Sequence, residues 1–197
     1  MKHLLFVLLL FPLSVSAQNT QVNAIKQQLM TYDSLIDQAK DEDLDFTPPH
    51  FTINSNLMER AIGEVNTKTT IYFDIQANED DDEPKDTSII RKVEVNINSV
   101  SYNINKTYFF NSKGQLIYYS ITENGYSCYT KQFYYNQNCF FVMFKQHKTD
   151  NCDEENSSND YNTSKLTKED LKASKTIKIT SNYYRQLLNT YFYFLRG

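Results

Sequence analysis

The chain has 197 residues and a formal net charge of −4, which argues against a nucleic-acid partner, because such partners usually require a basic surface. Its 15 Tyr and 13 Phe, set against only four Gly and four Pro, favour strands joined by few special loops. The sequence contains no zinc-binding, phosphate-binding or serine-hydrolase motif. We therefore assign no catalytic, cofactor-binding or metal-binding residue and expect no cofactor.

The first residues have the features of a secretory signal peptide. Lys2 supplies the positive charge, residues 4–13 form an apolar run, and small residues lead to a cleavage site between Ala17 and Gln18. The apolar run is shorter than the roughly 20 residues that a membrane-spanning helix needs. We expect removal of residues 1–17, no transmembrane segment afterwards, and a periplasmic or extracellular, surface-associated protein.

Three cysteines follow the predicted signal peptide, and an oxidising compartment would let two of them pair. A two-residue turn at 135–138 would place Cys128 opposite Lys145 and far from Cys139. Cys152 follows a polar stretch that could fold back, so the sequence favours a disulfide between Cys128 and Cys152. Three free thiols are the alternative.

Periodicity predicts a helix at residues 20–40, followed by strands. Its apolar stripe consists of Val22, Ile25, Leu29, Tyr32, Ile36 and Ala39. The helix should end near Lys40, because the prolines at 48–49 prevent its continuation. From Thr69 the period changes to two, which is typical of strands with one apolar and one solvated face.

An acidic run separates two of these strands at residues 78–83. Several carboxylates could bind calcium, but the run lacks the ligand spacing and the central glycine of a helix-loop-helix calcium site. The sequence favours a solvated hairpin tip, and calcium binding stays open.

Two similar aromatic hairpins follow. The segments at 108–119 and 133–143 each have an aromatic strand, a polar turn and another aromatic strand. Gly114 can supply the positive φ that the first turn needs. The sequence therefore predicts an antiparallel meander whose four strands lie at 106–111, 115–122, 127–135 and 138–146. Aromatic residues on both phases of these strands suggest that parts of both faces are covered.

The last part of the chain combines a polar loop with a helix. Residues 149–166 are acidic and rich in asparagine, which predicts a mobile polar loop. Thr167, followed three residues later by Asp170, resembles a capping box and should begin the final helix. The β-branched run at 176–180 weakens the helical prediction there.

The segment 89–119, behind a leader that ends Ser-Ala-Gln, resembles uncharacterised small exported proteins of Bacteroidota with aromatic β-hairpins and an Asn/Asp-x-x-Gly-x-Leu turn. The resemblance covers about residues 50–145. It implies a periplasmic or surface location and supplies no catalytic residues.

Together these patterns predict a single α+β domain at residues 18–197. We expect a twisted antiparallel meander of about five to seven strands, with an N-terminal and a C-terminal helix packed on one face. The leading functional hypothesis is a non-enzymatic binding module of the cell envelope that holds a protein, peptide or glycan on an exposed sheet face or edge strand. The alternatives are a small hydrolase acting on envelope material, and an inhibitor or chaperone-like partner of an enzyme.

Overall fold

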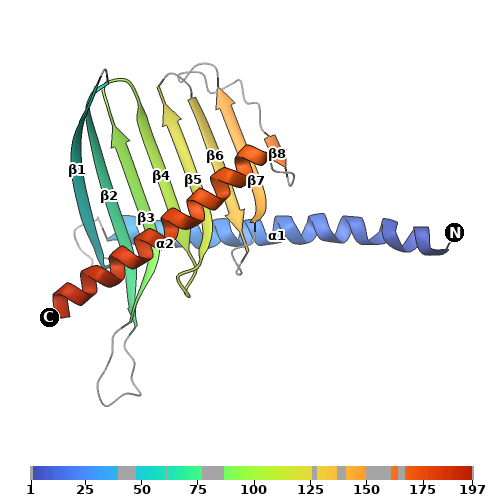
Figure 1. Cartoon of the computed structure of the whole chain (residues 1–197). Helices are drawn as coiled ribbons and strands as arrows, with labels where there is room; N and C mark the ends of the chain where they lie inside the picture. The colour runs from blue at the N-terminus through green and yellow to red at the C-terminus, as the bar shows by residue number, and fades with distance from the viewer. Residues whose placement is uncertain are drawn as a thin grey trace, which may run out of the picture.

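The computed structural model of the chain describes residues 2–39, 48–60, 62–76, 87–125, 128–136, 141–149, 161–163 and 167–196. These residues form two helices and eight strands (Figure 1). In chain order the elements are α1 (Lys2–Gln38), β1 (His50–Glu59), β2 (Gly63–Gln76), β3 (Thr87–Asn98), β4 (Asn103–Phe110), β5 (Leu116–Asn124), β6 (Cys128–Tyr135), β7 (Phe141–Thr149), β8 (Tyr161–Thr163) and α2 (Lys168–Arg196).

The strands form one sheet in which each strand lies beside its neighbours in the sequence, and every pair is antiparallel. The predicted α+β class and meander order are confirmed. The sheet has eight strands, more than the predicted five to seven, because the short β8 pairs with β7. The prediction of one continuous loop at 149–166 is therefore wrong in part. Residues 161–163 form β8, and Thr149 is the last residue of β7. The rest of that segment lies outside the described residues.

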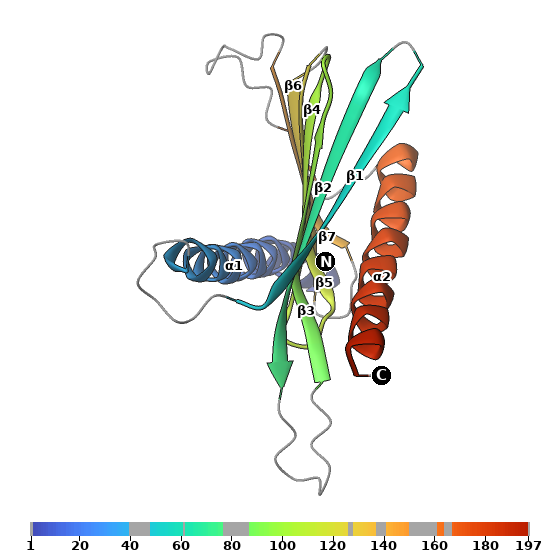
Figure 2. The same ribbon diagram turned by 90° about the vertical axis from the view of Figure 1, so that its left-hand side faces the viewer.

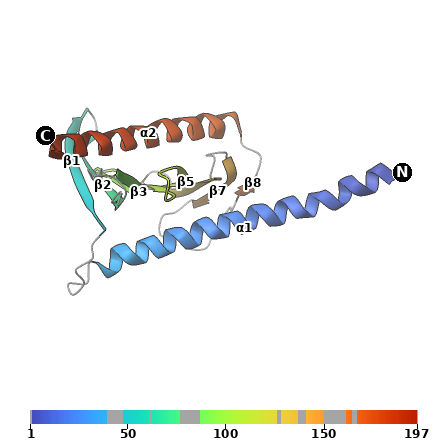
Figure 3. The ribbon, with the colours of Figure 1, turned by 90° about the horizontal axis from the view of Figure 1, so that it is seen from below.

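The two helices lie on opposite faces of the sheet (Figures 2 and 3). Ile177 and Leu188 of α2 are buried in one apolar cluster, whereas Val22 and Ile25 of α1 are buried in another. The prediction that both helices pack on one face is wrong. The reason is that consecutive aromatic residues in the central strands point alternately to both faces, so each face needs a cover.

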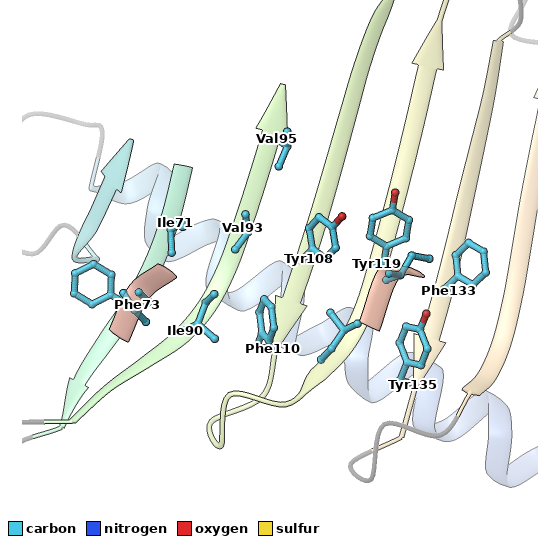
Figure 4. Close-up of a cluster of buried hydrophobic side chains, with 13 residues drawn as sticks. Ile71, Phe73, Ile90, Val93, Val95, Tyr108, Phe110, Tyr119, Phe133 and Tyr135 are labelled. Carbon is cyan, nitrogen blue, oxygen red and sulfur yellow. The ribbon is translucent and has the colours of Figure 1, made fainter. Parts of the chain in front are cut away.

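The cluster under α2 is formed mainly by the sheet (Figure 4). Its aromatic members contact the helix directly, because the ring centroids of Tyr108 and Tyr184 are 5.2 Å apart and those of Phe51 and Tyr191 are 4.2 Å apart. The hydroxyls of Tyr135 and Ser174 share a hydrogen bond of 3.2 Å between oxygens. The buried sheet members are Ile71, Phe73, Ile90, Val93, Val95, Tyr108, Phe110, Leu116, Tyr119, Phe133 and Tyr135.

The cluster under α1 contains one row of large side chains that runs across the sheet. Tyr72, Lys92, Phe109, Tyr118 and Tyr134 are direct cross-strand partners from β2 to β6, and all are buried. The helix covers this row with Val22, Ile25, Leu29, Tyr32 and Ile36. These helix residues follow the predicted three-four spacing, and α1 ends at Gln38, close to the predicted end.

The ends of α2 and of the first aromatic hairpin follow their sequence signals. The backbone N–H of Asp170 donates to the Thr167 hydroxyl at 3.1 Å, and the Asp170 carboxylate accepts from the Thr167 N–H at 3.2 Å, so the capping box is confirmed. In the turn between β4 and β5, Gly114 has a φ of +69°. The Asn111 side-chain oxygen accepts from the N–H groups of Lys113 and Gln115, which fixes the turn.

The second aromatic hairpin has a different register from the predicted one. Cys128 lies opposite Thr149 rather than Lys145, and Tyr134 lies opposite Met143. The cause is a connection between β6 and β7 that is longer than the predicted two-residue turn. The acidic run at 78–83 lies outside the described residues, so its calcium binding stays a hypothesis.

We predict that alkaline pH unfolds the protein together with ionisation of its buried tyrosines. Burial raises the pKa of Tyr129 to about 12 and also raises the pKa values of Tyr108, Tyr119 and Tyr134. The folded state holds these protons more tightly, so stability is complete below about pH 10 and falls as pH rises above it. Tyrosinate absorbance and circular dichroism, recorded against pH, should change together above that value. A complete tyrosine titration near pH 10 with unchanged circular dichroism would contradict the expectation.

Candidate functional site

Helix α1 crosses the strands and covers only part of its face of the sheet (Figure 2). The buried row that includes Tyr72 and Phe109 lies under the helix. Side chains on the same face recur at every second residue of a strand. From this row toward the turn between β1 and β2, the same face of β2 carries Thr70, Lys68, Asn66 and Glu64, and none of these residues is apolar. The part of the face beyond α1 is therefore open and polar.

Five asparagines form a row across this open part, with the pair Met58 and Glu64 lying beyond it on β1 and β2. The sheet register pairs Asn56 with Asn66, Asn66 with Asn98, Asn98 with Asn103, and Asn103 with Asn124. Directly paired residues of an antiparallel sheet lie on the same face, so one amide follows another across five adjacent strands. All five side chains are exposed. We call this set the asparagine row.

Two further polar rows lie between the asparagine row and α1. The middle row is Asn54, Lys68, Asn96, Asn105, Thr122 and Thr130, and the inner row is Thr52, Thr70, Glu94, Thr107, Ser120 and Gln132. Hydroxyls pair within both rows, because the oxygens of Thr52 and Thr70 are 3.2 Å apart and those of Thr122 and Thr130 are 3.1 Å apart. We call the three rows together the polar face.

The chemistry of the polar face is hydrogen bonding rather than catalysis. Each asparagine offers two N–H donors and a carbonyl acceptor, and each hydroxyl can do both. From β1 to β6 the charged residues of the three rows are Lys68 and Glu94, and Glu94 is already bound to Lys92; on β7 the register places Lys145 next to Gln132. Such a surface suits an uncharged ligand that presents many hydroxyl or amide groups.

A buried lysine joins α1 to the sheet at the border of the polar face. The Lys92 Nζ lies 2.5 Å from Asp33 Oδ1 on α1 and 2.5 Å from Glu94 Oε1. Burial works to lower the Lys92 pKa, but the two carboxylates outweigh it, so that the pKa is raised and the amine stays charged. This contact links α1 to β3 beside the inner polar row.

Strand β1 forms an edge of the sheet, because among the described strands it pairs only with β2. Most of its side chains are exposed, including Ile53, Leu57 and Met58. The strand has no proline or lysine, which are the residues that commonly protect an edge from pairing. Its outer backbone groups could therefore accept another extended segment.

Of the predicted special residues, Cys128 lies on the same face of the sheet as the polar face, two residues along β6 from Thr130. Ala17 and Gln18 lie within α1, which continues through the predicted signal peptide from Lys2. Cys128 is buried at the start of β6. Cys139 and Cys152 lie outside the described residues, so the pairing of Cys128 with Cys152 stays a prediction.

Among the described residues, neither helix is apolar over a length sufficient to cross a membrane. No group of three or more His, Cys, Asp and Glu side chains within the described ranges could hold a metal ion.

The asparagine row is not predicted by any local pattern in the sequence. The alternation of Asn96 and Asn98 with apolar residues was visible, but the row depends on register across five strands. Aligning the strands on their turns could have found it, because Asn98 and Asn103 flank one turn and Asn56 and Asn66 flank another.

Comparison of the chain with protein-family models, curated proteins and solved structures gives no match.

We predict that Lys92→Met lowers the free energy of unfolding by about 2 kcal/mol, because two carboxylates lose their shared cation. The cost stays moderate, since the Asp33 and Glu94 side chains are 40% and 33% exposed and can be hydrated. Urea unfolding measures the change, and Lys68→Met, an exposed position on the same face, is the matched control. Equal stability of the two variants would show that the buried contact does not hold α1 in place.

Proposed function

We propose that the chain is an exported protein of the cell envelope, acts as a non-enzymatic binding module, and binds an extended glycan on its polar face. The observation that carries the proposal is the asparagine row, whose exposed amides continue across β1 to β5 without interruption. Each of its five positions is uncharged, polar and accessible. Such a row is unusual for a purely structural surface and suits a ligand rich in hydroxyls.

The geometry of the sheet suits a linear polymer that crosses the strands. Adjacent strands are about 4.8 Å apart, so the asparagine row offers one amide at each such step. Successive sugar units of an extended glycan could each meet a new side chain. Individual hydrogen bonds to solvent-exposed amides contribute little, about 1 kcal/mol each, and several repeated contacts are needed for useful affinity.

Export fits the arrangement of α1. The N-terminal part of the helix projects beyond β7 and β8, while its C-terminal part crosses the sheet (Figures 1 and 3). Val22 is buried in the cluster under α1, downstream of the predicted cleavage site between Ala17 and Gln18. Removing residues 1–17 would thus leave this apolar cluster intact, and the polar face would mature in the compartment where envelope glycans occur.

A second candidate is a peptide partner that pairs with β1. The observation that favours it is the exposed, unprotected edge of that strand. The two earlier alternatives, a small hydrolase and an inhibitor or chaperone-like partner, gain no supporting feature from the described residues. The polar face presents a larger set of convergent side chains than the edge of β1.

We predict that the double variant Asn98→Val and Asn103→Val binds an extended oligomer of β-1,4-linked N-acetylglucosamine about tenfold more weakly than the unchanged protein. Valine is favoured in strands, so the sheet should persist while two hydrogen-bonding amides are lost. Isothermal titration calorimetry measures the affinity. Asn182→Ala, at an exposed position of α2, is the matched control and should leave binding unchanged.

Two outcomes of this titration would overturn the proposal. One is an unchanged protein that binds no such oligomer and no glycan extracted from the envelope. The other is binding that both variants retain in full. Weakening by substitutions in β1 alone, with Asn98 and Asn103 without effect, would instead favour the peptide at the edge.

We also predict the covalent state of the exported protein. Intact-mass analysis of protein recovered from the envelope should show a chain that begins at Gln18. The mass should be lower by one pair of hydrogens than that of the reduced form, and peptide mapping without reduction should join Cys128 to Cys152. An intact N-terminus or a reduced Cys128 in that fraction would contradict export with disulfide formation.

A further inference from the structure

A separate cleft lies between α1 and the turn that joins β4 to β5. Its volume is about 510 Å³, within the range of small-molecule sites. Ile25 and Ile117 supply apolar surface. The polar lining side chains are Gln21, Gln28, Arg91, Asn111, Ser112 and Lys113.

The lining of the cleft carries positive charge, although the chain as a whole is acidic. Arg91 and Lys113 both line it and none of the described lining residues is Asp or Glu, while Asp74 pairs with Arg91 from outside the lining. The remaining polar groups are amides and a serine hydroxyl, which can bind hydroxyl groups of a ligand. Charge and lining together select a hydroxylated anion over a cation or a neutral apolar molecule.

Arg91 is held in a fixed position. It is the extra residue at an irregularity in the pairing of β2 and β3, where Tyr72 pairs with Lys92 and Phe73 with Ile90. Its Nη1 donates to Asp74 at 2.6 Å, and its guanidinium carbon lies 5.3 Å from the centre of the Tyr32 ring. The buried Nε has no hydrogen-bond partner within the described structure. Asp74 accepts a hydrogen bond from one nitrogen of the Arg91 guanidinium, so other N–H donors of that group can bind a ligand.

Lys113 is positioned by a rigid turn. Asn111 accepts hydrogen bonds from the backbone of Lys113 and Gln115, and its amide nitrogen donates to the Gln115 side chain at 2.9 Å. The backbone is therefore fixed while the exposed Lys113 side chain can adjust to a ligand. Lys113 also lines a smaller cleft on the other side of the turn, together with Arg185 and Asn189.

We propose that this cleft binds a sugar-sized organic anion, with Arg91 and Lys113 holding its carboxylate or phosphate group. Gln21, Gln28 and Ser112 bind its hydroxyls, and Ile25 and Ile117 contact its less polar side. The site is separate from the polar face, because α1 and the turn form it on the other side of the buried row under the helix. Binding of an anion in this cleft is therefore independent of the proposed glycan binding.

The test is a calorimetric titration of the purified protein with three matched probes: glucose, glucuronate and glucose 1-phosphate. The charged sugars should bind and glucose should not, and the stronger of the two identifies the preferred anion. Affinity should fall as salt concentration rises, because the contacts are ionic. Lys113→Gln should weaken binding of the preferred anion about tenfold.

Two further variants complete the test. Arg91→Lys keeps the charge but loses the planar fork and should also weaken binding. Lys175→Gln, which removes an exposed charge from α2, is the control and should have no effect. Equal binding of glucose and the charged sugars, no binding of any probe, or full affinity in Lys113→Gln would each overturn the proposal.

Discussion

One half of this sheet carries large apolar side chains on both faces, and the rest of the structure depends on that constraint. Side chains alternate between the faces along a strand, yet Tyr108, Phe109 and Phe110 are consecutive and all buried, as are Phe133, Tyr134 and Tyr135. A single layer of helices could cover only half of these residues. One helix on each face removes both sets from water, which explains why α1 and α2 lie on opposite sides.

The same constraint leaves the polar face open. A helix is about 10 Å wide, whereas side chains on one face of a strand recur about every 6.6 Å, so a helix that crosses the strands covers only one or two positions of each. Strand β3 extends three such positions beyond Lys92, at Glu94, Asn96 and Asn98. These positions must tolerate water, and the sequence places a carboxylate and amides there. Lys92 marks the border, since it is bound to Asp33 of the helix and lies beside Glu94 of the inner polar row.

Much of the fold follows from local sequence patterns, whereas the candidate site does not. The three-four spacing of α1, the capping box at Thr167 and the turn at Gly114 are each contained in a few neighbouring residues, so each could be predicted. The prediction that both helices pack on one face of the sheet was wrong, although the consecutive aromatic residues already required a helix on each face. Register between β6 and β7 depends on a long connection, and the asparagine row depends on four strand pairings at once. Such long-range alignment is not encoded in any local period.

The central claim is that the amides beyond α1 are a ligand-binding surface, and nuclear magnetic resonance tests it most directly. Asparagine side-chain NH2 signals report contact at each amide separately. On addition of an extended oligomer of β-1,4-linked N-acetylglucosamine, the account predicts shifts at Asn66, Asn98 and Asn103 and none at Asn182 on α2. Shifts confined to other surfaces, or unchanged asparagine signals while the oligomer binds, would contradict it.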